Sequence, residues 1–187
     1  MKKLLVTLAA LLVSASSFAQ GTLIFNNRTQ QGDRPITYAV GPNAGQGLGS
    51  LPGAFAQLYL VTAGANGDVF TALTPSTPFR TGAAAAFFTE VNPFTVPGVQ
   101  PGASARFQVR AWQGAASYEA AVTTPTAYHG TSQIFTEDAL GGTPPGGGLP
   151  VPNPTPDGMN AFQLVPEPST MALGVLGAAA LLFRRRK

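Results

Sequence analysis

Apolar and polar side chains alternate regularly between residues 104 and 112. The apolar members fall on one face of an extended chain: Ala105, Phe107, Val109 and Ala111. The polar members fall on the other face: Ser104, Arg106, Gln108 and Arg110. A helix would mix the two sets, whereas a strand separates them, because successive side chains of a strand point to opposite faces. Residues 104–112 are therefore predicted to form a half-buried strand.

Shorter apolar runs recur through the body of the chain, with Gly or Pro near most of their ends. They predict further strands at residues 22–26, 36–40, 54–61, 69–73, 84–91, 118–122, 133–136 and 161–165. Many short strands separated by turn residues are typical of a sandwich or a barrel. The predicted fold class is all-β, with a single antiparallel β-sandwich of jelly-roll-like form over residues 20–165.

Residues 141–158 interrupt this pattern, because twelve of the eighteen are Gly or Pro. That composition does not support regular secondary structure. The segment is either a long ordered loop or a linker that holds the domain away from a membrane. The alternation of Phe162 and Leu164 just beyond it favours the loop, followed by a last strand docked on the sheet.

Charge and cysteine content exclude several classes of function for this protein. Only 10% of the 187 residues are charged and there is no Cys, which excludes a disulfide scaffold and a cysteine-ligated metal site. The net charge of +3 arises at the two ends, which hold six of the eleven basic residues. Residues 20–165 contain five arginines against seven acidic residues, a net charge of −2. Nucleic acid is not expected as a partner, because no basic cluster gathers phosphate-binding charge.

The first nineteen residues have the pattern of a secretory signal peptide. Lys2 and Lys3 precede an apolar run at residues 4–13, and small residues follow. Ser17 and Ala19 stand three residues and one residue before the expected cleavage site, which places cleavage between Ala19 and Gln20. The protein is predicted to be exported.

The last residues predict a membrane segment. Residues 171–183 carry no charge, and four cations follow at residues 184–187. Thirteen helical residues cover about 20 Å, less than the roughly 30 Å hydrocarbon core. A longer segment with snorkelling arginines comes closer to spanning it. We predict a transmembrane helix over residues 170–183, with the basic tail in the cytoplasm and the body of the chain outside.

The C-terminal end of the sequence contains three elements in this order: Pro166-Glu167-Pro168, the apolar segment and the terminal basic residues. Over residues 166–187 they resemble the PEP-CTERM sorting signal of exported proteins in Gram-negative bacteria. The resemblance implies that Pro166, Glu167 and Pro168 form a processing signal for an exosortase, a membrane-embedded cysteine transpeptidase-like enzyme. It also implies removal of the tail during sorting toward the cell surface or extracellular matrix. Members of this group differ widely in their bodies, so the resemblance implies a route and no particular activity.

Few residues are suited to catalysis. Glycoside hydrolysis needs two carboxylates, and the candidates near predicted strands are Glu90, Glu119, Glu137 and Asp138. Glu137 and Asp138 could instead join carbonyl oxygens around calcium. His129, the one histidine, falls in a predicted loop, and the chain has no G-x-S-x-G elbow. No spacing supports these sites, so solvated loop charges are predicted, without catalytic residue, metal or cofactor.

Sugar binding is a separate hypothesis, because aromatic side chains with a polar handle can stack on saccharides while hydrogen bonding to them. Trp112 falls by parity on the polar face of its strand, which makes it the candidate ligand-binding residue. The alternative is that Trp112 covers the edge of the core or packs beneath a loop.

The sequence thus predicts a non-enzymatic exported protein, held transiently at the inner membrane and then placed at the cell surface or in the extracellular matrix. The predicted role is structural or associated with exopolysaccharide. Two alternatives remain open: a carbohydrate-active enzyme that uses a carboxylate pair, and a membrane-anchored protein that faces the periplasm.

Overall fold

The computed structural model describes residues 20–29 and 31–166. The predicted signal peptide at residues 1–19, residues Glu167 and Pro168, and the predicted transmembrane segment at 170–183 lie outside the described residues. The described residues form twelve β-strands, one short α-helix and two 3-10 turns. None of the helices within them has the length and apolar character needed to cross a membrane.

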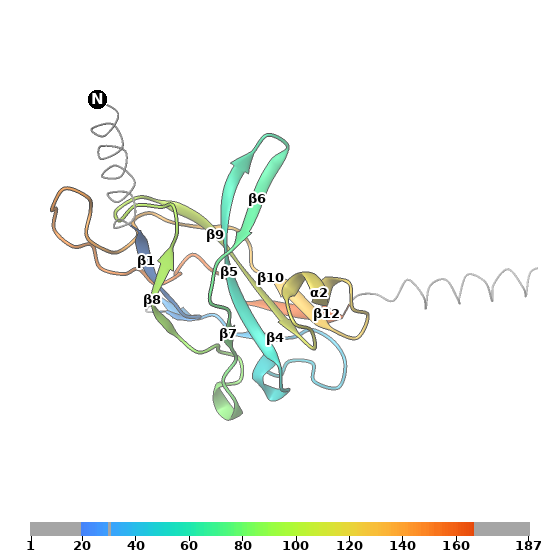
Figure 1. Cartoon of the computed structure of the whole chain (residues 1–187). Helices are drawn as coiled ribbons and strands as arrows, with labels where there is room; N and C mark the ends of the chain where they lie inside the picture. Colours follow the sequence, from blue (N-terminus) through green and yellow to red (C-terminus); the bar gives the residue numbers. More distant parts are fainter. Residues whose placement is uncertain (1–19, 30, 167–187) are drawn as a thin grey trace, which may run out of the picture.

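The largest sheet has eight strands (Figure 1). Six of them pair in the order β4 (Ile36–Tyr38), β12 (Phe162–Pro166), β10 (Tyr128–Thr131), β9 (Ala105–Gln113), β5 (Ala54–Gly64) and β6 (Gly67–Ala72). Two short strands lie off this row and pair with its central strands, β11 (Phe135–Glu137) with β9 and β7 (Thr77–Pro78) with β5. β9 and β5 form the centre of the sheet.

Two smaller ribbons accompany the sheet. One pairs β1 (Gly21–Phe25) with β8 (Val91–Val96), and the other pairs β2 (Arg28–Thr29) with β3 (Gly32–Asp33). The main hydrophobic core takes residues from the first ribbon and from the sheet, including Leu23, Phe25, Phe94, Leu58, Phe107 and Val109. The core therefore lies between two β layers.

The alternation at residues 104–112 is confirmed in β9. All four of its predicted core residues are buried, while Arg106 is exposed and Gln108 and Arg110 are half-buried. β5 and β6 form a hairpin that closes between Gly64 and Gly67 and projects from the body as an arm (Figure 1). Gly67 has a φ of +123°, a conformation that the tight closure needs and that other residues rarely adopt.

Six of the predicted shorter strands are confirmed, at least over part of their length, by β1, β4, β5, β6, β11 and β12. The prediction of a strand at residues 118–122 is wrong. These residues form the short helix α2 (Tyr118–Val122), which begins where the Ser117 side chain accepts a hydrogen bond from the Ala120 N–H. Alanine favours a helix, and the Ser117 side chain satisfies one of the free backbone N–H donors at the start of this helix.

The strand predicted at residues 84–91 is also wrong. The 3-10 turn η2 (Gly82–Ala84) and further turns occupy most of this range, and a strand begins only at Val91, as β8. Pro93 lies within β8, opposite a register shift in β1 between Leu23 and Phe25. A proline can be accommodated where a ribbon bulges, because no ladder hydrogen bond from its nitrogen is required there.

The all-β class is confirmed. The jelly-roll form is not, because the described strands pair as one eight-stranded sheet and two ribbons and not as two four-stranded sheets. The predicted antiparallel pairing also needs a correction: β12 runs parallel to β4. These two strands come from opposite ends of the described chain, so the long connection that parallel neighbours need is provided by most of the domain.

The Gly- and Pro-rich segment at residues 141–158 is an ordered loop and not a linker. Gly141 forms a bridge with Thr22, and Gly142 forms one with Val151. The Ile24 N–H donates to the Pro154 carbonyl at 2.8 Å, which fixes the loop against β1. The chain then enters β12, as predicted for a last strand docked on the sheet.

Candidate functional sites on the two faces of the sheet

Trp112 lies near the end of β9, on the face opposite the main core. Its ring is 2% exposed and packs with Ala121 of α2 and with Ala127 in a small second hydrophobic cluster. The indole N–H donates to the Ala115 carbonyl at 3.1 Å. Trp112 lies on the outer face, as its parity in the strand predicts, but α2 covers that position. The ring therefore has too little exposed area to stack on a sugar, and it packs beneath a loop as the alternative hypothesis described.

Arg110, two residues earlier in β9, lies among aromatic rings on the same outer face. Its guanidinium carbon is 4.2 Å from the ring centroid of Tyr59, 4.5 Å from that of Phe70 and 5.0 Å from that of Tyr118. Its Nε donates to the Gln108 side chain at 3.0 Å. Three aromatic faces around one cation form a strong cation–π arrangement. We call Arg110, Tyr59, Phe70, Tyr118 and Glu119 the arginine–aromatic cluster.

Glu119 closes this cluster from α2. Its Oε1 accepts a hydrogen bond from the Tyr59 hydroxyl at 2.7 Å and lies 3.8 Å from Nη1 of Arg110. Partial burial opposes ionisation of Glu119, but the hydrogen bond from Tyr59 and the charge of Arg110 outweigh it and lower the pKa of this carboxyl. Burial and the hydrogen bond to Glu119 raise the pKa of Tyr59. Glu119 is thus an ionised acceptor and is poorly suited to act as a general acid.

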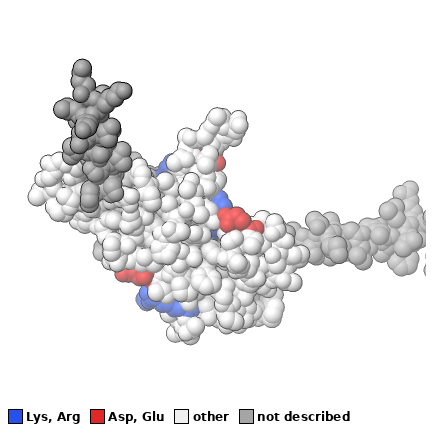
Figure 2. Space-filling view, in the orientation of Figure 1, with Lys and Arg blue, Asp and Glu red and all other residues white. Residues whose placement is uncertain are grey.

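The arginine–aromatic cluster joins the projecting arm to the body of the protein. Phe70 belongs to β6, Tyr59 and Arg110 to the central strands, and Tyr118 and Glu119 to α2. Figure 2 shows acidic and basic atoms side by side at the base of the arm, on a face that is otherwise mostly uncharged. The side chain of Glu119 is 62% exposed and that of Arg110 only 15%, so the carboxylate faces solvent while the cation lies beneath it.

His129 lies in β10 and not in the predicted loop. It pairs with Trp112 on one side and with Val165 on the other. Its ring meets that of Tyr118 edge-on, with centroids 6.0 Å apart. Its Nδ1 is buried and has no hydrogen-bond partner among the described residues. Glu90 lies elsewhere, where its Oε2 accepts a hydrogen bond from Asn26 at 2.8 Å.

Glu137 occupies the opposite, core-facing side of the sheet. It pairs in register with Ala105 and is 8% exposed. Its Oε1 has no hydrogen-bond partner in the part of the chain that the structure describes, and the same holds for the buried Oδ1 of Asp157. Burial raises the pKa of Glu137 to about 7, and the charges of Asp157 and Asp138 add to this effect.

Two carboxylates act on Glu137: Asp157 and its sequence neighbour Asp138. Asp157 belongs to the Gly- and Pro-rich loop, and nothing in its local sequence marked it as functional. The basic side chain bonded to this stretch, Arg34, donates to the backbone carbonyls of Met159 at 2.8 Å and Asp157 at 3.5 Å and not to a carboxylate. We call Glu137 and Asp157 the carboxylate pair.

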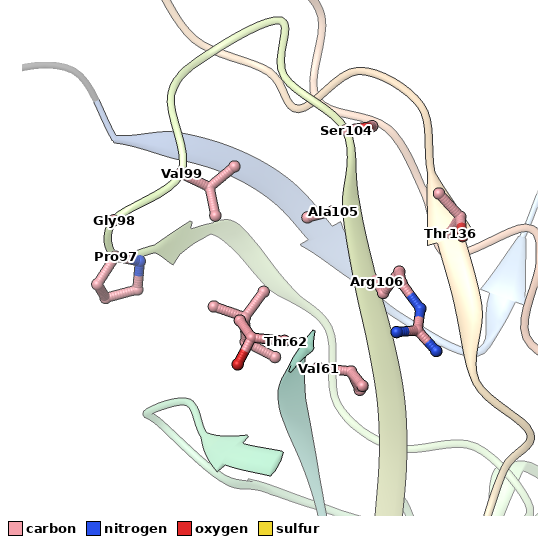
Figure 3. A pocket seen from close by; sticks show the side chains of 10 residues that line it. Val61, Thr62, Pro97, Gly98, Val99, Ser104, Ala105, Arg106 and Thr136 are labelled. Carbon is pink, nitrogen blue, oxygen red and sulfur yellow. The ribbon is translucent and has the colours of Figure 1, made fainter. Parts of the chain in front are cut away.

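Within the carboxylate pair, burial and the charge of Asp157 favour the neutral form of Glu137. A metal site is less well supported: across residues 20–29 and 31–166 no group of three His, Asp or Glu side chains is arranged to hold an ion. A surface cavity of about 400 Å³ opens nearby, between the start of β9 and the loop after β8 (Figure 3). Pro97, Val99 and Arg106 line it, whereas among the described residues neither member of the carboxylate pair does so.

The end of the described chain belongs to the same sheet. Leu164 in β12 is fully buried in the main core. Val165 pairs with His129, and Pro166 pairs with Tyr128 of β10. Residues 164–187 match the family model of the PEP-CTERM protein-sorting motif. The chain carries a PEP-CTERM sorting motif.

A motif of this kind implies export and processing by an exosortase at the membrane before surface localisation. The match covers the C-terminal end and does not extend to the β-rich body, whose activity it leaves open. Comparison with curated proteins and with solved structures finds no match to the chain. The function of the body therefore has to be argued from its own residues.

Proposed function

We propose that the processed protein is a non-enzymatic component of the cell surface or extracellular matrix and that it associates with exopolysaccharide. The observation that carries this proposal is the PEP-CTERM motif at residues 164–187, which directs an exported chain to the surface. A body of low charge with a folded β core is consistent with a structural role there.

The arginine–aromatic cluster supports the association with polysaccharide. Tyr118 is a half-buried aromatic ring, and Glu119 exposes most of its carboxylate beside it. Gln57 and Gln108 lie on the same face of the sheet and carry amide donors and acceptors. Saccharides bind to such surfaces because an aromatic ring contacts their C–H faces while polar groups bond to their hydroxyls.

The placement of the candidate acids supports a non-enzymatic role. Glu119 lies on the outer face of the sheet and Glu137 on the core-facing side, so these two cannot flank one glycosidic bond. Glu90 lies apart from both, beside Asn26. The two carboxyls of a glycosidase must lie within about 10 Å of each other on either side of the substrate.

A test of polysaccharide association uses mature protein purified from the surface fraction of its native host. Retention on immobilised host exopolysaccharide is compared for the wild type and for Tyr118→Leu, which removes the aromatic face but keeps apolar volume. We expect about tenfold weaker retention, since loss of one stacking aromatic costs on the order of 1 kcal/mol or more. Phe87→Leu is the matched control, because Phe87 also lies under an arginine, Arg28, outside this cluster.

Equal retention of the Tyr118→Leu and Phe87→Leu proteins would contradict a binding role for the cluster. Lack of retention by the wild type would contradict the association itself. Thermal unfolding of each variant is measured in parallel, because Tyr118 also packs beside Trp112. The membrane-anchored alternative is tested by the intact mass: a mature protein that keeps residues 171–187 in the inner membrane would replace the matrix proposal.

Catalysis is a second candidate function, favoured by one observation. The carboxylate pair combines an acid whose pKa is raised to about 7, Glu137, with a neighbouring carboxyl, Asp157. Pairs of this kind can divide the roles of acid and base. Hydrolysis of host polysaccharide by the wild type that is lost in both Glu137→Gln and Asp157→Asn would support catalysis. Absence of hydrolysis, or hydrolysis that survives both changes, would exclude this pair as its source.

A further inference from the structure

The sorting motif and the folded sheet share residues. The motif match begins at Leu164, whereas β12 runs from Phe162 to Pro166. The first three motif residues are therefore part of the folded domain.

These residues are held from two sides. The Leu164 side chain is fully buried, and its carbonyl accepts a hydrogen bond from the Ala39 N–H at 2.9 Å. Pro166 pairs with Tyr128, whose ring packs edge-on against Tyr38 with centroids 4.8 Å apart. β12 lies between β4 and β10, so it is an interior strand of the sheet.

An enzyme that processes a peptide segment usually binds it in an extended form through backbone hydrogen bonds. Residues already paired in a sheet are not available for that binding. The described part of the motif is paired as far as Pro166. In the sequence, only residues 167–170 lie between Pro166 and the apolar run at 171–183. Four fully extended residues span about 14 Å, which leaves little room between a folded domain and a membrane-embedded enzyme.

We propose that β12 gates processing: the exosortase competes with the sheet for Val165 and Pro166, and release of these residues from β10 limits the rate. The gate rests on the proposed processing by an exosortase. Val165 is 43% exposed and Leu164 is fully buried, so the strand can fray as far as Val165 while Leu164 stays in the core. The enzyme thus acts on a folded domain, and the mature protein keeps the core part of β12.

The test is a linker variant of the full chain in the native host. A ten-residue Gly/Ser linker followed by Val-Pro is inserted between Pro166 and Glu167, so that β12 stays intact and a complete Val-Pro-Glu-Pro motif follows the linker. We follow processing by pulse-chase and intact mass and expect it to be about fivefold faster, the factor that corresponds to the net contribution of one backbone hydrogen bond, about 1 kcal/mol. The matched control carries the same ten residues between Gly146 and Gly147, which are exposed and lie fifteen or more residues before β12. It should be processed at the wild-type rate.

A second variant, without a linker, tests whether weaker pairing of β12 speeds processing. Val165→Gly weakens the strand at an exposed position and should also speed processing. In the linker background, where Val165 is no longer part of the motif, the same change should have no effect on the rate. Amide hydrogen exchange at His129 and Val165 should be faster in Val165→Gly, whereas exchange in β9 should be unchanged.

The outcomes separate the gate from the proposed function. If wild-type processing depends on Glu167 but the linker variant is processed at the same rate or more slowly, the gate is wrong and the sorting proposal stands. If Glu167→Ala is processed like the wild type, the exosortase proposal fails and the gate fails with it.

Discussion

The two faces of the sheet shift the pKa of a glutamate side chain in opposite directions. On the outer face, Glu119 has a hydrogen-bond donor and a nearby cation, and its pKa is lowered. On the core-facing side, Glu137 is buried near two other carboxyls, and its pKa is raised to about 7. The difference shows that the sign of the shift follows from what surrounds each carboxylate. The outer face stabilises the ionised form of Glu119, whereas the core-facing side stabilises the protonated form of Glu137.

The largest expected effect concerns what covers the outer face. Trp112→Ala should lower the free energy of unfolding by about 3–5 kcal/mol, the usual cost of removing a buried large aromatic side chain. The measurement is chemical denaturation of the mature protein. A small effect would show that α2 does not enclose Trp112, and the outer face would then be an open surface.

The next effect is the pH dependence due to Glu137. Its pKa is about 4.5 in the unfolded chain and about 7 in the folded protein, so the folded state binds more protons between these values. Stability is therefore highest at and below about pH 4.5 for this group and falls by about 3 kcal/mol as the pH rises past 7. Denaturation curves between pH 4.5 and 8 check this. A wild type that becomes more stable toward pH 8 would contradict it.

Substitutions at Glu137 and at its acidic neighbours test whether Glu137 causes this pH dependence of stability. Glu137→Gln should remove most of the pH dependence and should be more stable than the wild type at pH 8, because a neutral amide replaces a buried charge. Asp157→Asn should reduce the dependence in part. Asp138→Asn is the matched control at the exposed neighbour, and it should have a smaller effect than Asp157→Asn because Asp138 contributes less to the shift of Glu137.

The smallest expected effect concerns Arg110. Arg110→Ala should cost about 2 kcal/mol, since a largely desolvated cation–π arrangement contributes on that order. It should also raise the pKa of Glu119, which loses its neighbouring cation. Arg106→Ala is the control, because Arg106 forms an exposed ion pair with Asp68 and should leave unfolding nearly unchanged. Equal losses in the two variants would remove the contrast between a buried cluster and a surface pair.

Local patterns in the sequence predicted the strands well where side-chain parity decides the structure. β9 was predicted because its two faces differ, and β12 because Phe162 and Leu164 alternate. Helix α2 was missed because five residues show no period, although Ser117 followed by an acid is a recognisable cap. β8 was missed because the apolar run at residues 84–91 predicts a strand there, whereas the strand begins only at Val91 and includes Pro93 at a bulge.

The candidate sites depended on contacts between distant segments, which the sequence does not contain. Parity assigned Trp112 to the outer face, but only the structure shows that α2 covers it. Glu137 was among the candidate acids, yet its partner Asp157 is twenty residues away in a loop with no periodic pattern. The environment of a carboxyl is set by such tertiary neighbours, so neither pKa direction could be derived from the sequence.

The parallel pairing of β4 with β12 has a consequence for how the domain folds. Gln163 and Thr37, which pair across these strands, are 126 residues apart in the chain. Contacts of such long range slow folding, because a large loop must close before they form. β4 cannot gain β12 as its strand neighbour until residues 162–164 are available to pair. The sheet is therefore completed by the last described strand, and not by strands added one after another from its N-terminal end.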